Sequence, residues 1–279
     1  MDNFDSNDST SSNPSPGAEV QPEEELSLSD KMVGIISEPS TTFEKISKFP
    51  PKTMDWFTPM LLLLVLVFIS QFLLLNNKEL YYQVKEKQIA RMEKNFNEMV
   101  KQGKMTQDQA NTQLNAIQDR MDKGITPVQI VFQGVGILIF GFIIFFIITG
   151  IYFLFAKFAF KGDGSYQSAL VASGMVSYIG MIQVIVTTIL AFVMGRMMND
   201  TSVASFMDMD KSTFTGFILA KLDVFSIWSY SVLSIGLAKM FKASSALKYF
   251  LLVFGVWILG GLLLFFLAEA IPFLKLFGM

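Results

Sequence analysis

Lys221 and Asp223 are the two ionisable residues that stand inside an otherwise apolar stretch of this chain, residues 214–238. A charged side chain at the centre of a membrane-spanning helix costs about 2.5–3.5 kcal/mol on insertion scales, so such residues commonly mark ion or proton sites. The two residues are two positions apart and therefore do not face each other on a helix. If one helix runs through the whole stretch, Asp223 lies near the membrane midplane and is a candidate pathway acid.

A second interpretation of Asp223 is structural. Asp is a favoured residue immediately before a helix, because its carboxylate accepts a hydrogen bond from a backbone N–H of the first turn. Here that donor is expected at Phe225 or Ser226, with Asp223 at headgroup level and residues 214–220 as an interfacial segment. We favour this cap, because it avoids an unpaired charge in lipid.

Small residues recur every fourth position early in the third apolar run, at Ala169, Ser173 and Ser177. This spacing places them on one helix face, and small side chains let neighbouring backbones approach closely in a membrane. The pattern predicts a helix–helix contact along that face.

Catalytic chemistry is poorly supported by the composition, which includes no Cys and no His. The chain therefore offers no thiolate nucleophile, no imidazole base and no usual zinc or haem ligand. No carboxylate pair falls within the apolar runs. The net charge of −2 also argues against nucleic-acid binding. The sequence predicts a protein that is not an enzyme and has no cofactor, no metal site and no nucleic-acid partner.

The elements that hold these residues are five apolar runs in a chain that is 52% hydrophobic. A hydrocarbon core of about 30 Å requires about 20 mostly apolar residues per helix. The runs are Pro59–Leu75, Val128–Phe155, Ala169–Gly195, Phe214–Ala238 and Leu247–Ala268. They predict an all-α, polytopic membrane protein with five transmembrane helices, within residues 53–279, and the lipid bilayer as its first partner.

The chain before the first run divides into two parts. Residues 1–28 are acidic and are expected to be a disordered tail. Residues 29–52 are amphipathic, with Lys31 among four lysines near the apolar positions, and Thr41 with Glu44 forms a capping-box pattern after Pro39. This segment either rests on anionic headgroups or forms two helices packed under the bundle, and the sequence leaves both open.

Residues 76–126, between the first two runs, are expected to form an extramembrane helical hairpin. Gly103 marks the turn, and Thr106 with Gln109 is a capping box for the second helix. Its apolar stripes predict that the two helices pack on each other.

The orientation is predicted from the Lys and Arg residues of the short segments outside the membrane. If the N-terminus is inside, the short segments on the inside carry more Lys and Arg than those on the outside. We therefore expect a cytoplasmic N-terminus and an external C-terminus.

Several motifs resemble one protein family. They are Gly164-Ser165-Tyr166-Gln167-Ser168-Ala169-Leu170, Leu222-Asp223-Val224-Phe225-Ser226-Ile227-Trp228, Ser234-Ile235-Gly236-Leu237 and Glu38-Pro39-Ser40-Thr41-Thr42-Phe43. In this order they resemble the Yip family of Ypt/Rab-interacting membrane proteins, in its bacterial branch. The resemblance implies five membrane helices, a cytoplasmic N-terminus, no known catalytic activity and a bacterial cytoplasmic membrane location. Eukaryotic relatives are associated with Rab GTPases and vesicle traffic, which bacteria lack, so a Rab-type GTPase is not an expected partner.

Two functions fit these features. The first is a non-enzymatic membrane protein that organises or scaffolds other membrane components, with the amphipathic N-terminal segment and the hairpin as its contact surfaces. The alternative is a small channel or transporter with Asp223 and Gln183 on its pathway. The alternative predicts that Asp223 pairs with a polar residue inside the bundle.

Overall fold

The computed structural model describes residues 24–124 and 126–270 of the 279-residue chain. Most of the predicted acidic tail, residues 1–23, lies outside the described part. The end of that predicted tail is helical, since α1 begins at Leu28 and Ser27 caps it.

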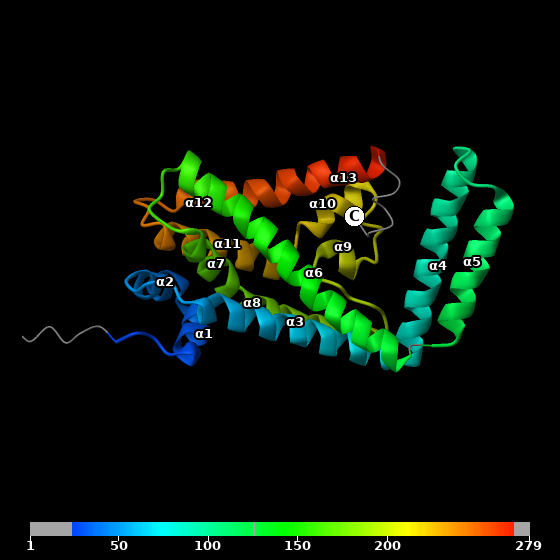
Figure 1. Ribbon diagram of the computed structural model, residues 1–279, viewed down its shortest axis with the longest axis horizontal. Coiled ribbons are helices and arrows are strands. Elements are labelled where there is room, and N and C mark those ends of the chain that lie inside the picture. The colour runs from blue at the N-terminus through cyan, green and yellow to red at the C-terminus, as the bar shows by residue number, and fades with distance from the viewer. Residues whose placement is uncertain (1–23, 125, 271–279) are drawn as a thin grey trace, which may run out of the picture.

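Five apolar helical segments run along the long axis of the molecule (Figure 1). Four are long and apolar enough to cross a membrane: α3, α6 with its π-helical end, α7 with α8, and α12 with α13. The fifth, α11, has 17 residues, which is about the lower limit for a span. Their bounds are α3 Thr53–Asn76, α6 Pro127–Leu154, α7 Tyr166–Met175, α8 Ser177–Met194, α11 Val224–Met240, α12 Leu247–Gly255 and α13 Gly261–Ala270. The all-α, multi-pass architecture predicted from the sequence is confirmed.

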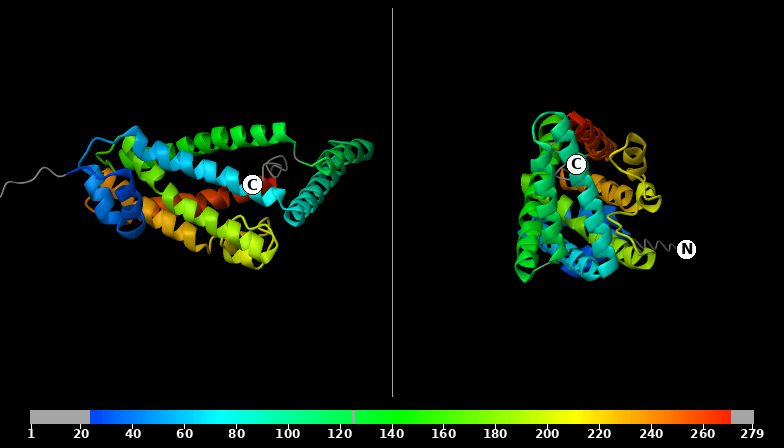
Figure 2. Two further views of the ribbon diagram at one scale, coloured as in Figure 1. Left: turned by 90° about the horizontal axis from the view of Figure 1, so that it is seen from below. Right: turned by 90° about the vertical axis from the view of Figure 1, so that its right-hand side faces the viewer.

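The other helices lie at the two ends of this bundle (Figures 1 and 2). One end carries the N-terminal helices, and the other carries the hairpin and the connection between α8 and α11. Their bounds are α1 Leu28–Ser37, α2 Pro39–Ser47, α4 Lys78–Lys101, α5 Gln107–Asp122, α9 Val203–Phe206 and α10 Phe214–Ala220.

The N-terminal helices pack against the bundle, as in the second of the two predicted arrangements. Ile35 of α1 and Phe43 of α2 are fully buried. A β-carbon at Gly236 of α11 would lie 2.7 Å from the Phe43 ring, so the missing side chain makes room for that ring. Met32 and Val33 remain exposed on the outer side of α1. Contact of that side with headgroups stays a prediction.

The predicted helix restart at Thr41 is wrong. α2 begins two residues earlier, at Pro39, and has no side-chain cap. Proline is favoured at the first helical position because its φ angle is already helical and its missing N–H would have no partner there. The Thr42 hydroxyl instead donates to the carbonyl of Glu38 at 2.9 Å.

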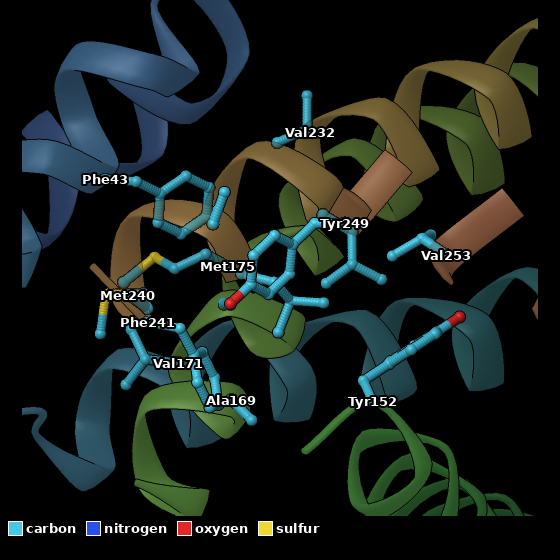
Figure 3. Packing of buried hydrophobic residues seen from close by; sticks show 14 of the residues in the cluster. Phe43, Tyr152, Ala169, Val171, Met175, Val232, Met240, Phe241, Tyr249 and Val253 are labelled. Atoms are coloured by element: carbon cyan, nitrogen blue, oxygen red, sulfur yellow. The ribbon is translucent and has the colours of Figure 1, made fainter. Parts of the chain in front are cut away.

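The main core lies where α2, α7, α11 and α12 meet (Figure 3). Tyr249, Met175 and Phe241 are among its buried side chains. Because α7 and α11 place small residues between these large ones, the helices approach closely around an aromatic centre.

The hairpin forms as predicted, with α4 and α5 packed on each other. Phe96 and Ala110 are buried between them. Gly103 has a φ of +68°, a conformation that favours glycine, and both hydrogen bonds of the Thr106–Gln109 capping box are present. The hairpin base is closed by the Tyr81 hydroxyl, which donates to the carbonyl of Met121 at 2.6 Å.

Candidate functional site

Asp223 caps α11. Its backbone is extended, and its carboxylate accepts a hydrogen bond from the backbone N–H of Ser226 at 3.0 Å. The residue is 1% exposed. The single helix over residues 214–238, which the first interpretation of Asp223 required, is not formed, since α10 ends at Ala220 and α11 starts at Val224. The cap hydrogen bond to Ser226 that the sequence predicted is confirmed.

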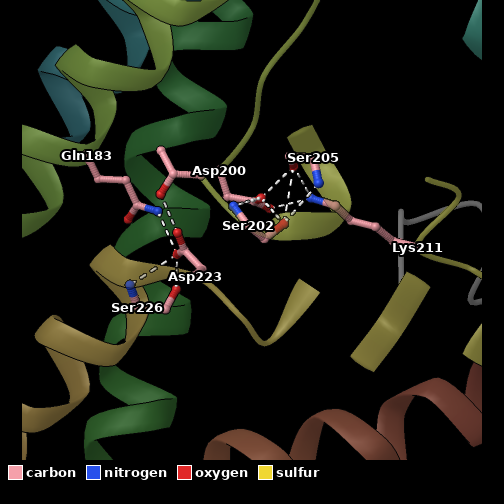
Figure 4. A network of polar contacts seen from close by, with 8 residues as sticks. Gln183, Asp200, Ser202, Ser205, Lys211, Asp223 and Ser226 are labelled. Carbon is pink, nitrogen blue, oxygen red and sulfur yellow. Dashed lines mark hydrogen bonds and ion pairs between the residues drawn. The ribbon is translucent and has the colours of Figure 1, made fainter. Parts of the chain in front are cut away.

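The same carboxylate also pairs inside the bundle (Figure 4). Gln183 of α8 donates to Oδ2 at 3.1 Å, and the Thr201 hydroxyl donates to Oδ1. Gln183 lies near the middle of the Tyr166–Met194 span, so Asp223 faces that part of α8 rather than its end. This position does not agree with a cap at headgroup level. The sequence analysis treated the cap and the pairing inside the bundle as alternatives, but Asp223 does both.

Both features are possible because the chain between α8 and α11 folds back along the bundle. The backbone N–H of Val203 donates to the carbonyl of Leu222 at 3.0 Å, and Ser202 and Asp223 form a single antiparallel β-bridge. This bridge places Thr201 against the carboxylate. Residues 195–222, which connect α8 to α11, therefore end the helical structure before α11 and also provide Thr201 as a hydrogen-bond donor to Asp223.

A second acidic residue, Asp200, organises the next part of this connection (Figure 4). Its Oδ1 accepts from the hydroxyls of Ser202 at 2.6 Å and Ser205 at 2.5 Å, and its Oδ2 pairs with Lys211. Burial raises the pKa of this carboxyl, but the hydrogen bonds from Lys211, Ser202 and Ser205 outweigh burial and hold the pKa below its usual value. Asp200 is therefore held as an anion that fixes the loop.

Lys221 turns away from Asp223, as the two-residue spacing predicted. Its Nζ donates to the carbonyl of Trp257 at 3.3 Å and lies 4.9 Å from the Phe217 ring centroid. The carbonyl belongs to the π-helical turn Val256–Gly260 between α12 and α13. Lys221 thus joins α10 to the last span through a backbone oxygen and aromatic faces.

The motif residues before the third span form a helix start and a tight contact. Ser165 caps α7 through a capping box with Ser168. A β-carbon at Gly164 would lie 2.7 Å from the Phe241 ring, so glycine is required for this loop to cover α11. The Tyr166 hydroxyl donates to the carbonyl of Phe146 on α6 at 3.1 Å.

The motif residues on α11 are aromatic packing residues. The rings of Phe225 and Trp228 lie 6.2 Å apart, and both pack against the main core. The motifs at 164–170 and 222–228 therefore each fix one helix start and its immediate neighbours.

The same motifs lie within one recognised domain. A family model described as the Yip1 domain matches residues 33–268, from α1 to α13. The chain belongs to the Yip1 family. This is not a known enzyme family. Searches of curated proteins and of solved structures found no significant match.

In this Yip1 domain the stripe of Ala169, Ser173 and Ser177 is interrupted, because the helix breaks at Val176 between α7 and α8. Ala169 and Ser177 are buried, and the Ser177 hydroxyl lies 3.7 Å from the sulfur of Met60 on α3. The Ser173 hydroxyl is buried without a partner in the described part of the chain.

A close approach of two backbones in this Yip1 bundle lies one residue from the predicted stripe. A β-carbon at Gly174 would lie 2.5 Å from the Cα of Trp56, which is a backbone atom of α3. The predicted close contact thus centres on Gly174, and the hydroxyl groups of Ser173 and Ser177 lie beside it.

Sequence reasoning missed one buried ion pair, which joins α1 to α3. Lys31 of α1 donates to Asp55 of α3 at 2.8 Å, and the two side chains are 4% and 5% exposed. Of the two arrangements that the sequence left open for residues 29–52, the one that places Lys31 at lipid headgroups is therefore excluded for this side chain. Asp55 lies in the first turn of α3, where an acidic residue also complements the helix dipole. The sequence did contain a signal for this pair, because a charged residue, Asp55, lies only a few residues before the first apolar run.

Proposed function

We propose that this protein is a non-enzymatic scaffold that organises other membrane proteins in the bacterial cytoplasmic membrane. The observation that supports it is the attachment of extramembrane helices to both ends of one bundle. A scaffold requires surfaces whose relative positions are fixed, and charged contacts that bridge elements far apart in sequence provide this.

At the N-terminal end, α1 is attached through the buried Lys31–Asp55 pair. α2 is attached to the end of α11 by Lys239, which pairs with Glu44 at 2.6 Å. Phe43 adds an apolar anchor against Gly236. The exposed sides of these helices are therefore presented in a fixed orientation.

At the opposite end, the hairpin contacts the α8–α11 connection. Lys87 of α4 pairs with Asp208 at 3.1 Å, and the Gln83 side chain donates to the carbonyl of Gly195 at 2.6 Å. Arg196 also pairs with Asp208, at 3.5 Å. The hairpin is thus attached to the bundle beyond its covalent links to α3 and α6.

Site-specific photo-crosslinking in native membranes tests this proposal. A photoreactive residue at exposed Val33 on α1 or at exposed Glu93 on α4 is expected to give discrete protein adducts. The same residue at Phe132, an exposed apolar position of α6, is the lipid-facing control. Adducts with lipid alone at all three positions would reject the scaffold.

We also propose that the N-terminus is cytoplasmic and the C-terminus external, from the distribution of Lys and Arg. The Cys-free chain permits single introduced cysteines at two exposed residues, Ser29 of α1 and Gln102 at the end of α4. The helices α1 and α4 lie at opposite ends of the bundle (Figure 1). In intact cells Gln102→Cys is expected to react with an impermeant thiol reagent, and Ser29→Cys is expected to be protected. The reverse pattern inverts the orientation.

The alternative function, a small channel or transporter, is favoured by one observation, the Gln183–Asp223 hydrogen bond inside the bundle. Ion flux into liposomes containing the purified protein tests it. Flux that Asp223→Asn abolishes would support the pathway, because an intramembrane carboxylate that carries ions cannot lose its charge. Under the scaffold proposal, neither protein conducts.

A further inference from the structure

A pocket of about 300 Å³ lies at the junction of the hairpin with the bundle. Its walls come from four elements: the last turn of α3 at Leu75, the start of α6 at Gln129 and Gln133, α4 at Lys85 and α5 at Arg120. The volume is at the lower end of the range of about 300–1,000 Å³ for small-molecule sites. The pocket therefore suits a compact group, such as a phosphate with its glycerol.

The charge of the pocket is positive. Its two charged lining residues, Lys85 and Arg120, are both basic. Lys85 pairs with Asp122, and this hydrogen bond raises the pKa of its ammonium group. Arg120 is exposed at the wall, and within the described residues no carboxylate forms an ion pair with it. The guanidinium is thus available to bind an anion, and its planar donors match phosphate oxygens.

The glutamines of the pocket add hydrogen-bond donors. Gln129 uses its carbonyl oxygen to accept from the backbone N–H of Thr126 at 2.8 Å, in the capping box of α6. Its amide NH₂ therefore remains as the donor end of the side chain. Gln88 and Gln133 contribute two further amides to the lining. Uncharged donors beside an arginine are typical of sites for a phosphate ester.

The position of the pocket identifies the source of that phosphate. α3 ends at Asn76 and α6 begins at Pro127, so the pocket lies where two membrane-length helices reach the polar region. Further into the bundle the two helices close on each other, since a β-carbon at Gly134 would lie 3.0 Å from the Phe68 ring. Leu73 and Phe132 near these ends are exposed and apolar. A ligand that has both a phosphate and hydrocarbon chains fits this arrangement, because the phosphate can bind in the basic pocket while the chains lie along the apolar surfaces of α3 and α6.

We propose that this pocket binds the phosphodiester headgroup of an anionic glycerophospholipid, with Arg120 contacting the phosphate and the acyl chains lying along α3 and α6. The bound lipid fills the space between the hairpin base and the two spans. This site is separate from the Asp223 cluster and does not depend on the scaffold proposal.

Native mass spectrometry of the detergent-solubilised full chain tests the site. The protein is titrated with phosphatidylglycerol and, separately, with zwitterionic phosphatidylcholine. We expect one tightly retained phosphatidylglycerol and about tenfold weaker retention in Arg120→Gln, because that change removes a charge-assisted hydrogen bond. Gln133→Leu is expected to weaken retention less. Lys101→Gln is the matched control, since it removes one positive charge from the far end of α4.

The proposal would be overturned by equal retention in Arg120→Gln and the wild type, by equal losses in Arg120→Gln and Lys101→Gln, or by no preference for phosphatidylglycerol over phosphatidylcholine. Displacement of the lipid by millimolar glycerol 3-phosphate would show a site for soluble phosphate esters instead, and would also overturn it. Unchanged unfolding temperatures of the variants exclude misfolding as the cause of a loss. If Arg120→Gln does not fold, Gln133→Leu decides the outcome alone.

Discussion

Gln183 on α8 donates a hydrogen bond of 3.1 Å to the carboxylate of Asp223, the residue that caps α11. Forty positions along the chain separate the two residues. The contact attaches the start of the shortest apolar helix to the middle of a span-length helix. It also supplies one of four donors that surround a carboxylate with 1% exposure.

The first prediction concerns that carboxylate. Asp223→Ala removes the cap of α11 and leaves buried donors on Gln183 and Thr201, so we expect a loss of about 2–4 kcal/mol of stability. Asp223→Asn retains an oxygen acceptor and should lose about 1 kcal/mol. Thermal unfolding in detergent measures both. Asp119→Ala, an exposed change on α5, is the control and should have little effect. Equal stability of Asp223→Ala and the wild type would contradict the structural role.

The second prediction concerns the contact of α7 with α3. Gly174→Ala brings a β-carbon to about 2.5 Å from the Trp56 backbone, so the helices must separate, and we expect a cost of about 1–3 kcal/mol. Gly136→Ala on α6 is the control, because no atom lies within 4 Å of its β-carbon position. That change should be neutral or stabilising, since alanine favours helix by about 1 kcal/mol. Ser173→Leu should destabilise as well.

Similar unfolding temperatures for Gly174→Ala and Gly136→Ala would show that α7 and α3 do not pack closely. The pair is informative because both substitutions add one methyl group at a glycine within a membrane helix. Only the distance to the neighbouring helix differs.

The third prediction concerns the buried ion pair at the N-terminal end. Lys31→Met leaves Asp55 charged and buried, so we expect a loss of about 3–5 kcal/mol. The double change Lys31→Met with Asp55→Leu should be less destabilising than Lys31→Met alone, because neither buried charge then remains. Glu25, which also pairs with Lys31, is partly exposed and keeps its pair with Lys52. Lys242→Met is the control, since its pair with Asp163 is exposed at 3.7 Å and contributes about 0–1 kcal/mol. A double variant as unstable as the sum of its single changes would argue against coupling.

The fourth prediction is a pH dependence at Asp200. Burial raises the pKa of this carboxyl, but hydrogen bonds from Lys211, Ser202 and Ser205 hold it below its ordinary value of 3.8. A lowered folded-state pKa contributes stability that is complete above the unfolded pKa and is lost as the pH falls through the folded pKa. We therefore expect Asp200→Asn to be less stable than the wild type at pH 7, and the difference to shrink below about pH 3.8.

Unfolding temperatures of both proteins across pH 3–7 check this dependence, and Asp119→Asn on the hairpin provides a comparison at an exposed site. A stability difference that stays constant over the whole range would mean that the Asp200 charge does not stabilise the loop.

The sequence alone determined the elements. Apolar runs of span length predicted the membrane helices, because about 20 apolar residues are needed to cross a hydrocarbon core whatever the neighbours are. Local signals also determined helix ends such as the caps at Thr106 and Asp223. A cap depends on a side chain and on backbone atoms two or three residues away, so it can be read from adjacent positions.

Only the tertiary structure decided which polar residues meet. Lys31 pairs with Asp55 and Gln183 pairs with Asp223, and neither partner follows from local periodicity. The close contact with α3 lies at Gly174, one residue from the predicted stripe, and the helix breaks two residues later at Val176, which the spacing of small residues did not predict. Pairing across the bundle is set by the relative rotation and depth of whole helices, and these follow from the packing of all their side chains together.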